Sequence, residues 1–372
     1  MNYDVIVIGA GSMGMAAGYF LAKSGKKTLL LDSFSPPHDK GSHHGETRII
    51  RYAYGEGEEY VPFVLRAKEL WAELEQLSGK QLFMPTGVLN VGVKQSDFIQ
   101  NTIKSSEKYS LPLEVLNAKE IQKRWQGITL SDDYIGSFEP TSGVLKCEEC
   151  INAYQELAEQ HGATILSNRR VKEINIQNDK VTIKTSNQTF NANSLVISAG
   201  AWTKDLLKML DLDAPLTPVR KTFAWYEANE QMYSQNHFPA FAFETPQGIY
   251  YGFPSIDGVG LKLGRHDGGE TVHPVMPLFP YGESDDKDLR QFLTQFMPNV
   301  EKLKYGKTCM YTLTPDEKFI IDLHPRYTNV AIAAGFSGHG FKFSSAVGQA
   351  LSNLILTGKN DIDISQFSFR RF

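Results

Sequence analysis

The feature that most constrains the fold is a glycine-rich turn near the start of the chain, which reads Gly-Ala-Gly-Ser-Met-Gly from Gly9 to Gly14. The apolar run Asp4–Gly9 before it is rich in β-branched residues, and the segment Met15–Ala22 after it has helical composition. A second apolar run, Lys27–Asp32, ends in an acid. Strand, glycine turn, helix, strand and terminal acid, in this order, are the parts of a dinucleotide-binding βαβ unit.

Each part of this unit has a physical role. Gly9 permits the tight turn, Gly11 lets the backbone approach a pyrophosphate, and Gly14 allows the helix to pack against the strand. The helix N-terminus offers free N–H groups to the phosphates, and the terminal acid accepts hydrogen bonds from ribose hydroxyls. The motif leaves open whether the dinucleotide is FAD or NAD. The predicted contacts of this unit are Gly9, Gly11, Ser12, Met13, Gly14 and Asp32.

Composition excludes several other classes of protein. At 372 residues the chain is long enough for about two domains. With a net charge of −4, the chain lacks the basic surface that binds nucleic acid. No apolar run approaches the ~20 residues of a membrane span. The N-terminus lacks a signal-peptide pattern, and three cysteines are too few for a disulfide framework. We therefore expect a globular, cytoplasmic protein.

The strand-to-glycine pattern of the N-terminus recurs at Leu195–Trp202 and at Asn329–Phe343. This recurrence predicts an α/β protein of two domains (α+β in its overall arrangement), with a Rossmann-type domain assembled from distant segments. A mixed-sheet substrate domain is inserted between those segments. We assign residues 1–78, 143–212 and 306–372 to the dinucleotide-binding domain, and residues 79–142 with 213–305 to the substrate domain.

Hydrophobic periodicity predicts the remaining elements. The segment Ser33–Gly57 is rich in Gly, Pro and His and reads as a long irregular loop, which predicts a functional role. Strand patterns cover residues 80–93, 163–185 and 219–264. Helices are predicted over Tyr60–Leu77, Phe98–Tyr109, Asn117–Arg124, Cys147–His161, Asp285–Phe296 and Ala346–Leu356.

Three motifs closely resemble the monomeric sarcosine oxidase family, which includes N-methyl-L-tryptophan oxidase. They are the segments His43–Arg51, Lys307–Thr312 and Gly335–Lys342. The resemblance implies a monomeric, FAD-dependent enzyme whose flavin is attached by a cysteine thioether to the 8α-carbon of the ring. It also implies the oxidation of an N-methyl amino acid by O₂, which yields the demethylated amino acid, formaldehyde and H₂O₂.

Cys309 is the cysteine that this resemblance assigns to the covalent flavin, although an isolated cysteine on a strand is more often a small buried hydrophobe. Attachment requires the thiolate, so a positive neighbourhood should lower the pKa of Cys309. Arg48 and His44 are the candidates to supply that field. The resemblance further assigns these cofactor contacts: Ser42, His43, Arg48, Val171, Gly200, Trp202, Gly338, His339, Gly340 and Lys342.

The other two cysteines, Cys147 and Cys150, have the spacing of half a metal site or of a redox pair. No second Cys or His pair of matching spacing accompanies them. On a helix they share one face over adjacent turns, so we interpret them as structural and predict no metal.

The substrate requires an anchor for its carboxylate, and Arg51 and Lys342 resemble the family's pair for that role. Tyr251 and Tyr311 resemble the aromatic walls around the amine and its methyl group; the alternative for each is an ordinary half-buried tyrosine. For the two cations the alternative is a solvated surface position.

Two further residues carry catalytic assignments from the same resemblance. His266 resembles the histidine that positions the substrate, and Lys262 resembles the lysine over the flavin that assists the reaction with O₂. A fixed cation there would stabilise developing superoxide, although a lysine between two leucines on a strand can also point to solvent. The sequence offers no general base, and an unprotonated secondary amine can lose its α-hydrogen directly to the flavin. The rate of flavin reduction should therefore rise with pH.

The substrate within the family is less constrained. Ala242 stands where sarcosine oxidases typically carry methionine, and a smaller residue opens room for a bulkier substrate. The segments Phe223–Tyr226 and His266–Gly269 also resemble the N-methyltryptophan enzymes. We favour sarcosine or a similar small N-methyl amino acid, with N-methyl-L-tryptophan close behind. More remote alternatives are an oxidase of another secondary amino acid, an NAD-dependent dehydrogenase and a non-catalytic flavin-binding module.

Overall fold

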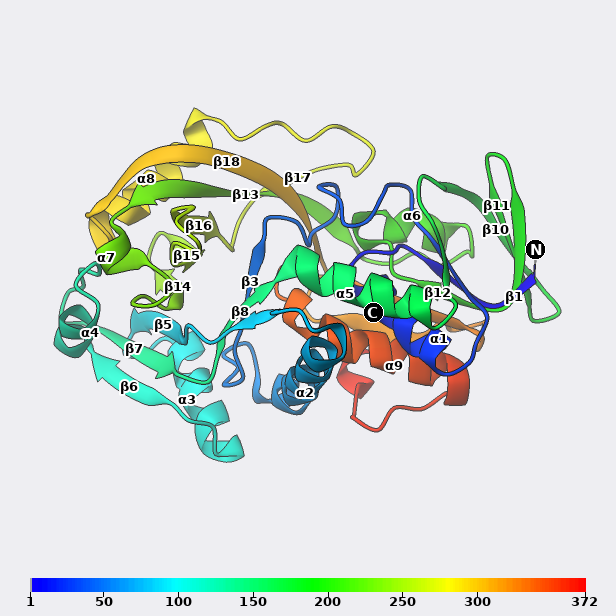
Figure 1. The fold of residues 1–372 in the computed structure, drawn as a ribbon, viewed down its shortest axis with the longest axis horizontal. Coiled ribbons are helices and arrows are strands. Elements are labelled where there is room, and N and C mark those ends of the chain that lie inside the picture. The colour runs from blue at the N-terminus through cyan, green and yellow to red at the C-terminus, as the bar shows by residue number, and fades with distance from the viewer. Residues whose placement is uncertain (1) are drawn as a thin grey trace.

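The computed structural model describes residues 2–372, which form two large β-sheets, a small sheet and a group of packed helices (Figure 1). An eight-stranded sheet and a nine-stranded sheet occupy opposite ends of the molecule, and a three-stranded sheet lies between them. None of the helices in residues 2–372 is long and apolar enough to cross a bilayer.

The eight-stranded sheet contains a parallel core built from segments far apart in the sequence. Its central order is β9-β2-β1-β12, and β20 pairs in parallel with the end of β12. These strands are β1 (Asn2–Ile8), β2 (Thr28–Leu31), β9 (Thr164–Leu166), β12 (Thr189–Ile197) and β20 (Val330–Ala334). The antiparallel strands β10 (Val171–Gln177), β11 (Lys180–Thr185) and β19 (Ile320–Leu323) complete the sheet. The prediction of a Rossmann-type unit assembled from distant segments is thus confirmed.

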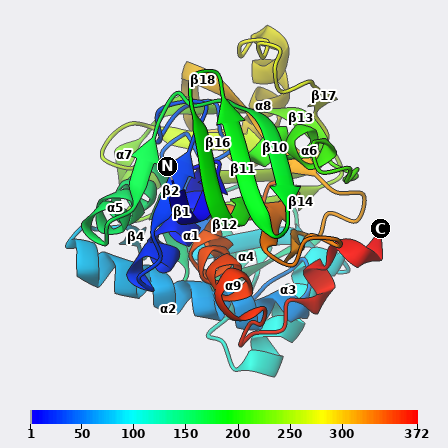
Figure 2. The same ribbon diagram turned by 90° about the vertical axis from the view of Figure 1, so that its right-hand side faces the viewer.

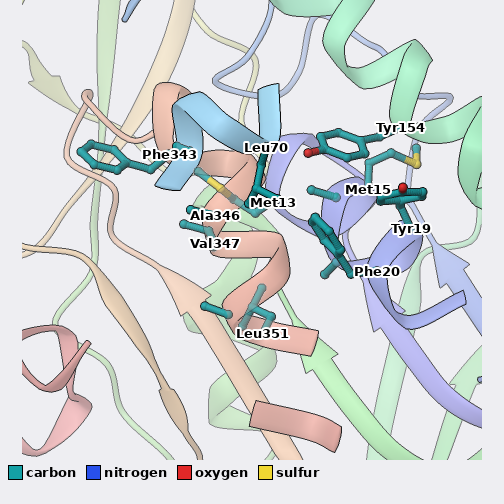
Figure 3. Close-up of a cluster of buried hydrophobic side chains, with 14 of the residues drawn as sticks. Met13, Met15, Tyr19, Phe20, Leu70, Tyr154, Phe343, Ala346, Val347 and Leu351 are labelled. Carbon is teal, nitrogen blue, oxygen red and sulfur yellow. The ribbon is translucent and has the colours of Figure 1, made fainter. Parts of the chain in front are cut away.

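Both faces of this sheet are buried, as expected for parallel strands. On β1, Val5 and Val7 join the core beneath the helices, whereas Ile6 and Ile8 join a second core on the other face. Four helices cover the first face: α1 (Ser12–Lys23), α2 (Val61–Ser78), α5 (Cys147–Gln160) and α9 (Ser344–Thr357). Figure 2 shows α2 and α9 beneath the sheet, and Figure 3 shows side chains of all four helices meeting in one cluster. The second face packs on α6 (Thr203–Lys208).

The closest helix contact of this core joins α1 to α9. A Cβ on Gly348 would lie 2.4 Å from the Cβ of Ala16, so the two helices approach at a distance that only glycine allows. Figure 3 shows Ala346, Val347 and Leu351 of α9 beside the residues of α1. This approach fixes the start of α1, and with it the glycine turn, against the C-terminal part of the chain.

The nine-stranded sheet is mixed, with the order β17-β13-β16-β15-β14-β5-β7-β6, and β18 pairs with β13. In Figure 1, β13 and β18 run side by side from this sheet toward the other end of the molecule. The strands are β5 (Val88–Val93), β6 (Glu114–Asn117), β7 (Tyr134–Glu139), β13 (Thr217–Ala228), β14 (Ala240–Thr245), β15 (Gly248–Phe253), β16 (Leu261–Arg265), β17 (Glu270–Thr271) and β18 (Val300–Leu313).

The two faces of this sheet have different partners. One face packs its aromatic and leucine side chains on α8 (Glu283–Phe296) and α4 (Ala118–Arg124). The opposite face carries every predicted substrate residue of the sheet, because successive side chains of a strand alternate between faces. Lys262, His266 and Tyr251 share this second face with Tyr311 and Cys309.

The three-stranded sheet corrects one prediction. The segment Ser33–Gly57 is not wholly irregular, because β3 (Thr47–Ile50) lies within it and pairs with β8 (Gly143–Lys146). β8 also pairs with β4 (Phe83–Met84). The pairing is long-range, so no local pattern in a four-residue strand revealed it. β3 is functionally placed, since it carries Arg48 and leads directly into Arg51.

The seven predicted helices, including the one after the glycine turn, are all present, with ends within a few residues of those expected. The helix α3 (Asp97–Tyr109) begins at a Ser96 side chain that accepts the N–H of Ile99, and α4 begins with a capping box between Asn117 and Glu120. The predicted elements do not include the short helices α6 and α7 (Glu230–Tyr233) or the strands β3, β6, β7, β8, β17 and β19.

Candidate functional site

An elongated cavity begins at the glycine turn and runs toward β18. The loop before β3, the start of β10, the turn after β12 and the turn after β20 all contribute to its walls. Six distant parts of the chain, counting β18, therefore meet here. The predicted cofactor residues in its lining are Gly9, Gly11, Ser12, Met13, Asp32, Ser42, His43, Arg48, Val171, Gly200, Trp202, Gly338 and Gly340.

The glycine turn has the geometry that its sequence predicts. Gly9 has a φ of +92°, and a Cβ there would lie 2.6 Å from the carbonyl oxygen of Ser198. A Cβ on Gly14 would lie 1.8 Å from the carbonyl oxygen of Gly9, so only glycine lets α1 pack this close. The buried Asp32 carboxylate accepts the N–H of Ala10 and the N–H of Phe34, both at 2.8 Å. Asp32 thus joins the end of β2 to the turn.

Three polar groups of the cavity wall have no hydrogen-bond partner. They are Nε2 of His43, Nε of Arg169 and Oγ1 of Thr312. Leaving a buried polar group unpaired costs about 1–3 kcal/mol, so such groups are usually satisfied by a bound molecule or water. Burial also lowers the pKa of His43 to about 3, so its ring is neutral. The wall fits a long ligand with polar groups along its length.

Arg48 lines the cavity and acts electrostatically on Cys309 of β18, next to the lining residue Met310. Arg48 donates to the backbone carbonyls of Thr47 at 2.8 Å and of His44 at 3.0 Å. Because these acceptors are uncharged, the guanidinium keeps its positive charge available to its surroundings. The His44 ring packs on Phe223 with 5.7 Å between centroids, and burial lowers its pKa to about 4.

The expected lowering of the Cys309 pKa is wrong. Burial is the largest influence and raises the pKa of this thiol above its ordinary value, while Arg48 and Lys262 oppose the rise. The sequence indicates that cations lie near the thiol, but it does not show how deeply the strand is buried. Cys309 has a free thiol and is 2% exposed.

Lys262 is buried rather than solvated. Its Nζ donates to Oγ1 of Thr47 at 3.0 Å and to the carbonyl of Gly45. The ammonium also lies over the rings of Phe253 and Phe223, at 4.7 and 4.8 Å from their centroids. Burial is the main cause that lowers the pKa of Lys262 to about 7, and Arg48 lowers it further.

Arg51 and Lys342 converge on one residue, Tyr54. The Arg51 guanidinium lies 5.3 Å from the centre of the Tyr54 ring and the Lys342 ammonium 5.2 Å from it. Arg51 also forms an ion pair with the carboxylate of Glu56. The buried Glu139 carboxylate also acts on Arg51, so two carboxylates face the two cations. Nε of Arg51 has no hydrogen-bond partner, which leaves a guanidinium donor for an external carboxylate.

The charges of this group are set by burial and by one another. Burial and then Arg51 lower the pKa of Lys342 to about 7. For Glu56, burial acts to raise the pKa, but Arg51, His339 and Lys342 hold it down at about 2. Glu56 is therefore ionised at neutral pH.

Two glycines make room for the two predicted aromatic walls. A Cβ on Gly264 would lie 2.8 Å from the Tyr251 hydroxyl, and a Cβ on Gly338 would lie 2.2 Å from the Tyr311 ring. The His266 ring packs against Tyr311 with 5.7 Å between centroids. Burial lowers the pKa of His266 to about 4, so this histidine is neutral under ordinary conditions.

Ala242 lies beside Tyr251 and Asn90, its partners on the neighbouring strands β15 and β5. Asn90 is fully buried, and its Oδ1 has no hydrogen-bond partner. The three side chains point to the same face of the sheet, since residues in register share a face. The small Ala242 therefore has a polar neighbour on one side and an aromatic neighbour on the other.

The family of this chain follows from its sequence. Residues 4–354 match the family model described as DAO, FAD dependent oxidoreductase. The match covers nearly the whole chain. The chain belongs to the FAD-dependent oxidoreductase family.

Relatives within this flavoprotein family are similar over their full lengths. The chain is 54% identical to the monomeric sarcosine oxidase of Bacillus sp. (strain NS-129), over 100% of this chain and 97% of that protein. It is 44% identical to the N-methyl-L-tryptophan oxidase of Yersinia pestis (strain Pestoides F), with 100% of both covered.

Solved structures of the oxidoreductase fold superpose closely. NikD, described as an unusual amino acid oxidase essential for nikkomycin biosynthesis, has a TM-score of 0.87 at 25% identity and covers 99% of this chain and 97% of its own. The L-proline dehydrogenase of P. horikoshii has a TM-score of 0.89 at 23% identity, covering 100% and 98%. The predicted fold class is confirmed by both.

The cavity of this flavoprotein fits the FAD that its family requires. The glycine turn leaves space for a pyrophosphate, Asp32 stands at the end of β2, and unpaired polar groups line the walls. Four predicted contacts, Gly14, Cys309, His339 and Lys342, are not among the residues that line the cavity. Gly14 lies beneath the turn, and His339 lies in an aromatic cluster, where Nδ1 bonds the Tyr54 hydroxyl at 2.7 Å.

Several residues of the site had not been predicted. Arg169 lines the cavity, Glu56 pairs with Arg51, and the buried Glu139 accepts the N–H groups of Tyr52 and Ala53 at 3.0 and 3.2 Å. Their positions depend on long-range pairing, which no local pattern reveals. A proximity signal existed only for Glu56, which follows Arg51 by five residues.

Cys147 and Cys150 are both free and buried in the core beneath α1 and α2. Burial raises the pKa of Cys147 to about 12, so its thiol is protonated and unreactive. The structural interpretation of this pair agrees with their surroundings.

Proposed function

We propose that this flavoprotein oxidises N-methyl amino acids with O₂, with sarcosine as the favoured substrate and glycine, formaldehyde and H₂O₂ as products. The observation that carries the proposal is the pair of buried cations, Arg51 and Lys342, which both lie over the Tyr54 ring, with Nε of Arg51 lacking a hydrogen-bond partner. Full-length relatives at 54% and 44% identity are named for sarcosine and N-methyl-L-tryptophan. The alternative substrate is therefore N-methyl-L-tryptophan.

FAD, when bound, supplies the acceptor for two electrons and a hydrogen from the C–N unit of the substrate and passes the electrons to O₂. We propose that the thiol of Cys309 holds it covalently at the 8α-carbon. Arg48 and Lys262 support this assignment, because both cations act against the burial that disfavours the Cys309 thiolate. The cavity residues predicted above as cofactor contacts would hold the remainder of the molecule.

The chain binds the substrate through two cations and a set of aromatic side chains. Arg51 offers a planar fork to a carboxylate, and Lys342 adds a compact charge. Tyr251, Tyr311 and the neutral His266 then surround the amine without adding a charge next to it. A neutral environment favours the unprotonated amine, which is the form able to lose hydrogen from carbon.

We also propose a division into two domains and a monomeric state. Residues 1–78, 143–212 and 306–372 form the cofactor domain, and residues 79–142 with 213–305 form the substrate domain. The sarcosine-oxidase relatives carry the word monomeric in their names, and we extend that state to this chain.

A substrate panel tests the proposal. We expect peroxide on addition of sarcosine to the flavin-loaded protein, with N-methylalanine, N-methyl-L-tryptophan and proline compared at equal concentration. NAD⁺ should neither replace nor stimulate the reaction. Activity with proline alone would move the chain to another class of secondary-amine oxidase.

Carboxylate binding should weaken as pH rises above about 7. Lys342 has a pKa of about 7 without ligand, and a bound carboxylate raises that pKa by stabilising the ammonium. Below pH 7 the lysine is charged with or without ligand, so affinity is constant; above it, binding requires proton uptake. Methoxyacetate, in which an ether oxygen replaces the amine of sarcosine, isolates this effect. Its Kd should rise up to about tenfold per pH unit.

The matched control for this pH dependence is Lys342→Met. The variant should bind methoxyacetate more weakly but with a Kd that is flat between pH 6 and 9, since the nearby Arg51 remains charged throughout. A wild-type Kd that does not change over the same range would contradict the assignment of Lys342 as an anchor.

Enlarging residue 242 should narrow the substrate range. In Ala242→Met, the longer side chain occupies space beside Tyr251 and Asn90 on the site face of the sheet. The ratio of kcat/KM for sarcosine to that for N-methyl-L-tryptophan should increase by about tenfold or more. An unchanged ratio, in a variant with an unaltered melting temperature, would show that residue 242 does not limit substrate size.

A further inference from the structure

Lys221 on β13 is a buried lysine whose ammonium caps a turn of backbone. Its side chain is 4% exposed, and its Nζ donates to the carbonyls of His266 at 2.6 Å and of Asp267 at 2.8 Å, and also to that of Gly268. An ammonium group has three hydrogens, so these three acceptors use all of its donors.

The register of the sheet places this lysine on the same face as the candidate site. Lys221 pairs with Cys309 on β18, and Phe223 pairs with Gly264 on β16. Because these two strands are antiparallel, a step of two residues from the Phe223–Gly264 pair places Lys221 opposite His266. Its ammonium also lies 5.2 Å from the centre of the Tyr311 ring. Lys221 thus lies between the strand of Cys309 and the turn that carries His266.

The turn after β16 needs such a cap. Its glycines are in the left-handed region, with φ of +64° at Gly268 and +101° at Gly269, and three successive carbonyls converge on one point. Converging carbonyl dipoles repel one another unless a cation or donor lies between them. The Asp267 carboxylate does not serve Lys221, because it accepts from Arg265 and from the N–H of Ile249.

We propose that Lys221 is a positioning residue for substrate oxidation. By holding the 266–268 turn, it fixes the ring of His266 against Tyr311 and so orients the amine beside that ring. The inference rests on the proposed function, in which His266 contacts the substrate. It assigns no contact between Lys221 and the substrate itself.

The variant that tests this role is Lys221→Met, which keeps the length of the side chain and removes every donor. We expect kcat/KM for sarcosine to fall at least about tenfold, almost entirely in kcat. The Kd of methoxyacetate should stay within about twofold, because the carboxylate anchors Arg51 and Lys342 are untouched. Lys221→Arg, which retains several donors, should recover most of the loss.

Lys304→Met is the matched control. Lys304 also donates to a backbone carbonyl of a neighbouring strand, that of Val259 at 2.6 Å, but it lies on the exposed part of β18. This variant should leave kcat, KM and the Kd of methoxyacetate unchanged. If Lys221→Met does not fold, Lys221→Gln, which keeps one donor pair, takes its place in the same measurements.

A double-mutant cycle with His266→Ala decides between a positioning role and a general structural one. If Lys221 acts through His266, the double variant should have the kcat of His266→Ala within about twofold. The inference would be overturned if the kcat losses of the two single variants multiplied in the double variant. It would also be overturned if the Kd of methoxyacetate in Lys221→Met rose by the same factor as kcat/KM fell. Wild-type protein that oxidises no N-methyl amino acid would instead refute the proposed function, which the same assays reveal separately.

Discussion

Replacing Cys309 with alanine should convert a protein that keeps its yellow colour in the acid-precipitated pellet into one that releases all of it to the supernatant. A thioether survives acid denaturation, whereas FAD held only by the glycine turn and the cavity walls is lost when the fold is lost. Cys309 is the free cysteine on the site face of the nine-stranded sheet, within the influence of Arg48 and Lys262.

The other two cysteines provide the matched controls. Cys147→Ala and Cys150→Ala remove thiols buried beneath α1 and α2, and both variants should keep acid-stable flavin. Absorbance at the flavin maximum, read separately in pellet and supernatant, gives the result. Acid-stable colour in Cys309→Ala, or acid-labile colour in the wild type, would exclude this cysteine as the attachment site.

At pH 6, below the Lys262 pKa of about 7, replacing Lys262 with methionine should slow the reaction with O₂ by about 10²- to 10³-fold, the usual cost of removing a fixed charge-stabilising donor. Lys262 is 2% exposed, and its ammonium is held by Gly45 and Thr47 over aromatic rings. A cation in so dry a place stabilises negative charge that develops on oxygen more strongly than a solvated one.

The two halves of the reaction distinguish this role from a structural one. Stopped-flow reduction by sarcosine without oxygen should change by less than about threefold in Lys262→Met, while reoxidation in air-saturated buffer takes the whole loss. Equal losses in both halves would show that the variant disturbs the fold of the site. Lys304→Met again provides a lysine control on the same sheet.

The local parts of this fold could be predicted from the sequence because they depend on short-range chemistry. The turn from Gly9 to Gly14 is specified by steric limits at glycine, and α2 and α9 are specified by apolar periodicity. By contrast, β3 is a four-residue strand, and its pairing with β8 depends on residues almost a hundred positions away. No local pattern contains that information.

In the site, too, residue types could be predicted from local motifs, whereas their three-dimensional surroundings could not. The motifs indicated Arg51 and Lys342 as a pair, and the structure brings both to Tyr54. The charge balance could not be predicted, because it depends on how Glu56 packs in three dimensions. Lys262 shows the limit most clearly. Its alternation with two leucines is the same for a solvated lysine and for a buried one, and only the assembled sheets distinguish them.

Product stoichiometry shows whether the chain removes the methyl group of a secondary amino acid at the expense of O₂. Flavin-loaded protein given sarcosine in a closed oxygen electrode should form equal amounts of formaldehyde, glycine and H₂O₂, one of each for every O₂ consumed. Formation of none of these products from sarcosine, or from any other N-methyl amino acid, by protein that holds its full complement of FAD would contradict the account.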